Sequence, residues 1–223
     1  MTPSMICLSV GETTAKSCLK SLKGVRFAEV RLDKLEEDPL EAVPAIFGSA
    51  AKLIATCRPS RLSERARAEV LLAAIRAGAA FVDVEVESLS GIGKAVVREA
   101  HRQRCPVIVS FHDEAGTPER SKLSRIIRRA FSGGADIAKI ACRVRSPRDN
   151  ARLLGLLDSD RPLVIIGMGP QGRACRLFAP FLGSPFTFAS ASSGRETAPG
   201  QIPIRELQRA VLAIQAATGE RRR

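Results

Sequence analysis

The chain contains no tryptophan and no tyrosine, and aromatic residues make up only 4% of its 223 positions. Its phenylalanines do not alternate with basic residues, as a platform for stacking nucleic-acid bases would require. No run of roughly 18 apolar residues occurs, and no charged-then-apolar leader is present, so we expect neither a membrane span nor an export signal. These absences argue against nucleic-acid and membrane partners.

The six cysteines are scattered, and no C-x-x-C pair occurs among them. Cys7, Cys57 and Cys142 lie in apolar runs, where cysteine usually behaves as a small core residue. Neither a metal site nor a disulfide framework is therefore expected. A reduced, cytoplasmic setting is the simplest interpretation.

Acidic residues are few: 23 Asp and Glu stand against 35 Lys and Arg, for a net charge of +12. A basic RNA-binding protein is one interpretation, supported by Arg128-Arg129 and the Arg-Arg-Arg terminus. The arginines, however, are spread over helix-like segments and do not form one stripe. A positive site that attracts a small anionic substrate fits this distribution better.

Apolar, strand-like runs recur along the chain and alternate with segments of helical periodicity. In Glu64 to Gly78, for example, one helix face carries Val70, Leu71, Ala74 and Ile75, and a last amphipathic helix is expected from Ile204 to Ala217. The eight runs are Met5–Val10, Arg26–Leu32, Lys52–Cys57, Phe81–Val86, Pro106–Phe111, Ile137–Cys142, Leu163–Met168 and Phe186–Ser190.

Eight strand-helix units without a linker predict a single-domain (β/α)8 TIM barrel over residues 1–223. A doubly wound open sheet is the rival fold, but no G-x-G-x-x-G follows the first strand. The loosely matching run Gly167–Gly172 follows the seventh strand, where barrels often hold anions. The barrel therefore predicts that polar side chains at the carboxyl ends of its strands form the active site.

Lys139 stands inside the apolar run Ile137–Cys142, where an ammonium group is costly to bury unless it is paired or neutralised. Burial favours the neutral amine, which is a nucleophile toward carbonyl groups. A lysine that snorkels into solvent from the strand end is the alternative. The other polar strand-end residues are Glu29, Arg31, Arg58, Asp83, Glu85 and His112.

The ordered motifs of the chain resemble those of type I 3-dehydroquinate dehydratases. They include Glu29-Val30-Arg31-Leu32-Asp33, Thr56-Cys57-Arg58, Val82-Asp83-Val84-Glu85, Ser110-Phe111-His112-Asp113, Ile137-Ala138-Lys139-Ile140-Ala141, Gly167-Met168-Gly169 through Cys175-Arg176-Leu177, and Thr197-Ala198-Pro199-Gly200-Gln201-Ile202. Each motif alone is a weak signal, whereas the set in this order is specific and spans nearly the whole chain.

The resemblance implies a hydro-lyase of the shikimate pathway that converts 3-dehydroquinate to 3-dehydroshikimate through an imine on Lys139. His112 would serve as the acid and base of the elimination, since histidine ordinarily titrates near neutral pH. Glu85 would orient His112. No metal and no organic cofactor is implied. Another Schiff-base barrel enzyme, such as an aldolase, and an inactive barrel used as a regulator are the alternatives.

The resemblance also implies a set of substrate-binding residues. Arg176 would clamp the substrate carboxylate, although Arg173 stands close in the sequence and competes for this role. Glu64 is a candidate for the histidine-positioning glutamate that the family carries after Arg58. The family further implies a homodimer. The substrate-binding set is Glu29, Arg31, Arg58, Asp83, Met168, Arg176, Phe188, Thr197, Ala198 and Gln201.

Overall fold

The computed structural model describes residues 6–218, which divide into two compact units. Unit 1 holds the described residues of Met1–Ser9, His112–Ser124 and Lys139–Arg223, and unit 2 holds Val10–Phe111 and Arg125–Ala138. Three strands, β1 (Ile6–Val10), β5 (Val107–Asp113) and β6 (Ile137–Arg143), contribute residues to both units. Helix α5 (Arg120–Ser132) does the same.

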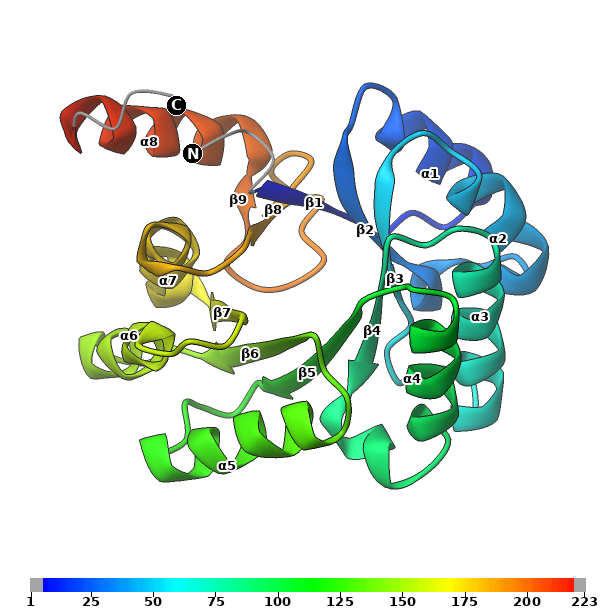
Figure 1. Cartoon of the computed structure of the whole chain (residues 1–223). Helices are drawn as coiled ribbons and strands as arrows, with labels where there is room; N and C mark the ends of the chain where they lie inside the picture. Colours follow the sequence, from blue (N-terminus) through cyan, green and yellow to red (C-terminus); the bar gives the residue numbers. More distant parts are fainter. Residues whose placement is uncertain (1–5, 219–223) are drawn as a thin grey trace. The chain divides into compact units, whose positions relative to one another are not determined.

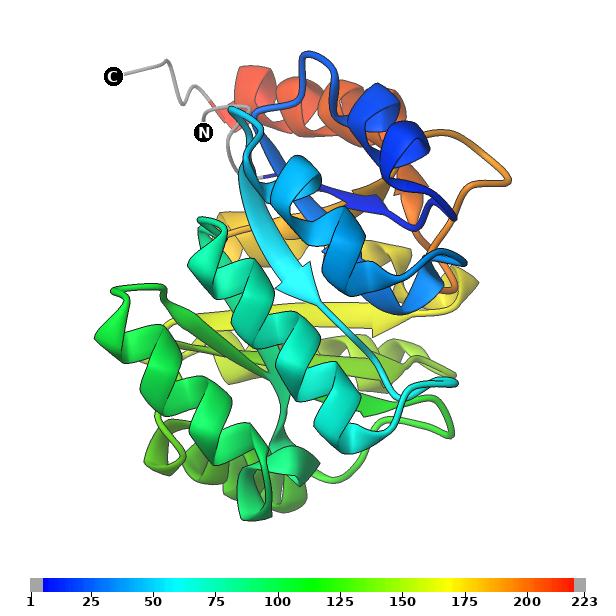
Figure 2. The same cartoon turned by 90° about the vertical axis from the view of Figure 1, so that its right-hand side faces the viewer.

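Unit 2 is built on parallel strands with helices packed beside one another. Its strands β2 (Phe27–Arg31), β3 (Lys52–Thr56) and β4 (Phe81–Glu85) are hydrogen-bonded neighbours, and β4 also pairs with β5. Helix α3 contacts α2 and α4, and the three run side by side in Figures 1 and 2. The helices are α1 (Ala15–Leu22), α2 (Pro39–Phe47), α3 (Glu64–Arg76) and α4 (Gly93–Arg102), with 3-10 turns η2 (Leu32–Lys34) and η3 (Val86–Ser90).

Helix α3 shows how the local sequence sets these elements. The side chain of Ser63 accepts a hydrogen bond from the backbone N–H of Ala66 and so caps the helix. The predicted apolar face, which includes Val70 and Leu71, is buried. Because α3 packs on β3 and β4, its first turns lie next to the ends of those strands, where the charged residues follow.

Unit 1 contains all of β1 except Val10, together with β7 (Leu163–Met168), β8 (Thr187–Ser190) and β9 (Ile202–Pro203). Strand β8 pairs in parallel with β1 and with β9. Leu207 of the last helix packs on Ile6 and Ala189. The helices are α6 (Pro147–Leu154), α7 (Arg173–Phe178) and α8 (Ile204–Thr218), with 3-10 turns η4 (Gly155–Leu157), η5 (Pro170–Gly172) and η6 (Ala179–Leu182).

All eight predicted strands are present within the described residues, and the last helix ends one residue beyond its predicted end. The two-residue strand β9 was not predicted, because two residues carry no alternation. The prediction of one domain over residues 1–223 stays a prediction, and the Glu220–Arg223 tail lies outside the described residues. Between residues 6 and 218, no helix is long and apolar enough to cross a membrane.

Candidate active site

Lys139 is the third residue of β6, and only 5% of it is exposed to solvent. Its Nζ lies over the Phe188 ring on β8, 4.4 Å from the ring centroid. The alternative in which this lysine snorkels into solvent is therefore wrong. The structure instead holds the amine in an apolar setting inside unit 1.

His112 belongs to the same unit as Lys139 and is half-buried near the carboxyl end of β5. The turn that follows is organised by Asp113, whose Oδ1 accepts hydrogen bonds from the backbone N–H groups of Ala115 (2.9 Å) and Gly116 (3.1 Å). This Asx-type turn ends the strand directly after the histidine.

Arg176 on α7 is among the most deeply buried side chains, with 1% of it exposed. Its Nη atoms donate to the backbone carbonyls of Phe188 (3.5 Å) and Pro199 (3.3 Å). Arg173, at the start of the same helix, is exposed. Of the two arginines that the sequence left open, Arg176 is thus the one whose guanidinium is enclosed among residues of unit 1.

A close backbone approach explains why α7 lies against β7. A Cβ atom built on Gly172 would come within 2.3 Å of the carbonyl carbon of Gly167. Only glycine permits this spacing, and so the loosely matched Gly167–Gly172 run has a packing role. Met168, the last residue of β7, is buried beside this loop.

The segment from Thr197 to Gln201 is held by its own hydrogen bonds and by the ends of two strands. Gln201 Oε1 accepts from the backbone N–H of Thr197 at 2.8 Å, and Gln201 Nε2 donates to Thr197 Oγ1 at 3.1 Å. Thr197 Oγ1 also lies 2.6 Å from Ser9 Oγ of β1. The backbone N–H of Gly169 donates to the Pro199 carbonyl at 3.1 Å. The half-buried Ala198 lies within this docked segment.

In unit 2, four polar side chains at the strand ends form one hydrogen-bonded cluster. Arg58 donates to Asp83 Oδ2 at 2.9 Å and to Ser110 Oγ at 2.8 Å, and Ser110 in turn donates to Asp83 Oδ1 at 2.5 Å. Arg58 also reaches Glu85 Oε1 at 3.4 Å. Burial lowers the pKa of the Arg58 guanidinium, but Asp83, Glu29 and Glu85 outweigh that effect and raise it.

Arg31 and Glu29, both predicted site residues, have separate partners in unit 2. Arg31 makes a bidentate ion pair with Asp33, at 2.9 and 2.7 Å. Burial raises the pKa of Asp33, but the hydrogen bonds and charge of Arg31 outweigh burial and lower it. The buried Glu29 accepts from Thr56 Oγ1 at 3.0 Å.

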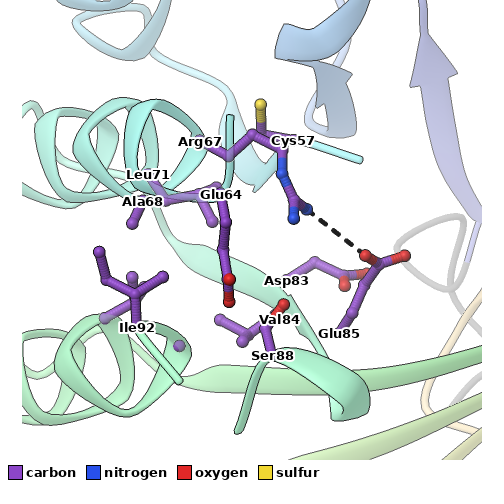
Figure 3. Close-up of a pocket in the computed structure, with 12 residues that line it drawn as sticks. Cys57, Glu64, Arg67, Ala68, Leu71, Asp83, Val84, Glu85, Ser88 and Ile92 are labelled. Carbon is purple, nitrogen blue, oxygen red and sulfur yellow. Dashed lines mark hydrogen bonds and ion pairs between the residues drawn. The ribbon is translucent and has the colours of Figure 1, made fainter. Parts of the chain in front are cut away.

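Glu85 lines a small pocket with Glu64 and Arg67 of helix α3, shown in Figure 3. The pKa of Glu85 is raised, mainly by burial and also by Asp83 and Glu87, while Arg58 and Arg67 oppose the rise. Glu64 is exposed at the start of α3, and its carboxylate faces Gly91. Within the described part of the chain, Glu85, and not Glu64, is the carboxylate with ion-pair partners in this pocket.

Several residues that hold these clusters were assigned no role from the sequence. Ser110 could have been found, because strand alternation puts it on the same side as His112. Asp33 and Thr56 stood in the quoted motifs without a role. Arg67 and Ser9 had no local signal. Within the described part of the chain, no group of three or more His, Cys, Asp or Glu side chains could hold a metal ion.

Solved structures with the same fold define the class of the chain. One is a 3-dehydroquinate dehydratase from Geobacillus kaustophilus HTA426, with 26% sequence identity and a TM-score of 0.85. The match covers 96% of this chain and 91% of the Geobacillus chain. Another is a type I 3-dehydroquinate dehydratase from Clostridium difficile, solved with covalent modified comenic acid, with 25% sequence identity and a TM-score of 0.83. That match covers 96% of this chain and 93% of the Clostridium chain. The chain is a (β/α)8 barrel enzyme, as the sequence predicted.

The family follows from sequence. A family model described as Type I 3-dehydroquinase matches residues 6–218. A 3-dehydroquinate dehydratase of Thermococcus gammatolerans is 36% identical over 192 residues, which cover 83% of this chain and 86% of that protein. The chain belongs to the type I 3-dehydroquinase family, a family of hydro-lyases. This membership decides against the aldolase alternative.

Proposed function

We propose that the chain dehydrates 3-dehydroquinate to 3-dehydroshikimate in the shikimate pathway through a covalent imine on Lys139. Lys139 is assigned as the nucleophile because it is buried on β6, with its Nζ over the Phe188 ring. An amine in such a setting reacts with a ketone without any metal or organic cofactor.

In the proposed reaction, Lys139 Nζ attacks the ketone carbon, and water leaves to give an iminium ion. The iminium acidifies the adjacent carbon, and His112 removes a proton from that carbon while the electron pair moves toward the iminium nitrogen. His112 then gives the proton to the departing hydroxyl group, which leaves as water while the enamine electron pair returns to form the new C=C bond and restores the iminium, now conjugated. Hydrolysis of the conjugated iminium returns the enone product and the free lysine, so the net change is the loss of one water molecule.

The binding roles in unit 1 are assigned by chemistry and burial. Arg176 clamps the substrate carboxylate, because a guanidinium group offers two parallel donors to a carboxylate. Met168 and Phe188 shape the pocket around Lys139. The Thr197–Gln201 segment, which includes Ala198, is the lid, and its docking on β1 and β7 excludes water during the reaction.

The binding roles in unit 2 fall to its charged cluster. Glu29, Arg31, Arg58 and Asp83 orient the ring hydroxyl groups of the substrate, and Glu85 orients His112. Arg58 is preorganised for this task by Asp83, so little ordering remains to be done when substrate binds.

We also propose that the enzyme works as a homodimer in the cytoplasm. Two copies of the chain offer two independent active sites in this proposal, since all assigned residues come from one chain. Sedimentation at micromolar concentration measures the assembly, and a monomeric mass at that concentration would contradict it.

Borohydride trapping tests the imine. Wild-type protein incubated with 3-dehydroquinate and borohydride should gain one reduced adduct, and peptide mass spectrometry should place it on Lys139. Lys139→Met should gain none, whereas Lys122→Met, which alters an exposed lysine, should react as wild type does. His112→Ala should form the adduct slowly and eliminate poorly.

Two results would contradict these assignments. A wild-type protein that forms neither adduct nor conjugated enone would overturn the proposed function. Turnover by His112→Ala equal to that of the wild type would overturn the role of His112 and leave the imine assignment standing.

A further inference from the structure

Arg67 on helix α3 faces the carboxylate of Glu85 at the end of β4 (Figure 3). Its Nη1 lies 3.5 Å from Glu85 Oε2, and Arg58 Nη1 lies 3.4 Å from Glu85 Oε1. Each carboxylate oxygen therefore faces a different guanidinium group. At these lengths charge attraction contributes more than directional hydrogen bonding.

Within the described residues, the guanidinium group of Arg67 has one hydrogen-bond partner. Glu85 is the one residue there that accepts a hydrogen bond from it, and the buried Nε of Arg67 has no partner. Only 13% of the side chain is exposed, so solvent replaces little of the lost hydration. The desolvation cost of a guanidinium offsets much of what one ion pair contributes to stability, so a role other than stability is the better reason for this pair.

The walls of the pocket strengthen the ion pair. Apolar side chains of α3 and β4, such as Ala68, Leu71 and Val84, line the pocket of about 20 Å³ beside Arg67 and Glu85. A low local dielectric extends the reach of the charge on Arg67. The titratable groups that line this pocket with Glu85 or act on its charge include Cys57, Arg58, Glu64, Arg67, Asp83 and Glu87.

We propose that Arg67 is a positioning residue for the dehydration, because with Arg58 it holds the Glu85 carboxylate from both sides in the orientation that serves His112. This inference rests on the proposed function, in which Glu85 orients the histidine. In the sheet, Glu85 is the register partner of Ser110, and His112 follows two residues later on the same strand. Arg67 itself touches neither substrate nor the reacting atoms.

The electrostatic effect of losing Arg67 has a definite sign. Burial already raises the pKa of Glu85, and Arg67 is one of the two groups that oppose this rise. Without Arg67 the pKa of Glu85 moves further up, so the carboxylate takes up a proton at a higher pH. The contact of Arg67 with Oε2 is also lost, while the contact of Arg58 with Oε1 remains.

Arg67→Gln tests this role. We expect the acid limb of the kcat/KM profile to move up by about one pH unit, which lowers kcat/KM on that limb roughly 10-fold. The borohydride adduct on Lys139 should still form. Arg67→Lys keeps the charge and should recover part of the shift. Arg65→Gln removes an exposed arginine of the same helix and should match the wild type.

A double-mutant cycle guards against a merely structural effect. If Arg67 acts through Glu85, adding Arg67→Gln to Glu85→Gln should move the profile no further than Glu85→Gln alone. Thermal unfolding of each variant shows that the protein measured is folded, and Arg67→Lys replaces Arg67→Gln in the cycle if the latter does not fold.

The outcomes distinguish a failure of the proposed function from a failure of the role given to Arg67. A wild-type protein without adduct and enone would overturn the proposed function. An active wild type with an Arg67→Gln profile identical to its own would overturn only the role of Arg67. The same holds if Arg67→Gln lowers activity equally at every pH, or if its effect adds in full to that of Glu85→Gln.

Discussion

Gly200→Ala is the sharpest test of the lid, because two backbone segments meet at this residue. A Cβ atom built on Gly200 would lie 2.2 Å from the carbonyl oxygen of Gly169, at the end of β7. Ordinary van der Waals contact begins near 3.4 Å, so the lid has to withdraw by about 1 Å. Gly200 also has a φ of +78°, in the left-handed region that favours glycine.

The cost of this withdrawal can be worked from the contacts it breaks. The Pro199 carbonyl accepts from the Gly169 N–H at 3.1 Å and from Arg176 at 3.3 Å, and both hydrogen bonds depend on the docked lid. At about 1 kcal/mol each, their loss comes to about 2 kcal/mol. Since 1.36 kcal/mol corresponds to a factor of ten, we expect kcat/KM to fall about 30-fold.

Gly194→Ala is the matched control. Gly194 lies in the same connection between β8 and β9 and has a φ of +82°, but a Cβ atom there would meet nothing within 4 Å. The two variants therefore share the backbone strain and differ in the contact with Gly169. We expect Gly194→Ala to stay within about threefold of the wild-type kcat/KM.

The assay follows the absorbance of the conjugated enone product at several substrate concentrations, and thermal unfolding confirms that both variants are folded. Because the same two hydrogen bonds stabilise the folded protein, the midpoint of unfolding of Gly200→Ala should lie roughly 4–8 °C below that of Gly194→Ala. A Gly200→Ala kcat/KM within threefold of that of Gly194→Ala would refute the reasoning, since the Gly169 contact would then cost nothing.

Three further results are expected. Arg176→Lys keeps the charge but loses the bidentate fork, so KM should rise about 10-fold with kcat little changed, and an unchanged KM would count against the clamp. Asp33→Asn should lower the free energy of unfolding at pH 7 by about 1–3 kcal/mol. Because Arg31 lowers the pKa of Asp33, the ion pair stabilises the fold fully above pH 3.8. Urea unfolding should therefore show that the difference in unfolding free energy between Asp33→Asn and the wild type shrinks as the pH falls below this value. Burial raises the pKa of Cys57 and Cys142 to about 12, so iodoacetamide at pH 8 should modify these thiols slowly in the native protein and readily in urea; rapid native modification would contradict their burial.

Local patterns in the sequence determined the elements and the family. The run around Lys139 is apolar on both sides, so strand β6 could be predicted from residues next to one another. The same holds for helix α3, whose apolar residues repeat at helical spacing and whose cap, Ser63, immediately precedes it. The order of the motifs, each only a few residues long, was sufficient to indicate the type I dehydroquinase family.

Tertiary structure alone decided which of the chemically equivalent residues is enclosed. Arg173 and Arg176 are three positions apart on one short helix, and only packing buries the second. Glu64 and Glu85 line one pocket, yet of these two only Glu85 has ion-pair partners among residues 6–218.

The contacts that hold the site in place join residues far apart in the chain. Ser9 meets Thr197 across 188 positions, and Arg67 reaches Glu85 from a helix that precedes its strand. Local periodicity reports which face of an element is apolar, because it depends on neighbours in sequence. It carries no information about which distant side chain will complete a hydrogen bond, because that choice is made only when the elements pack.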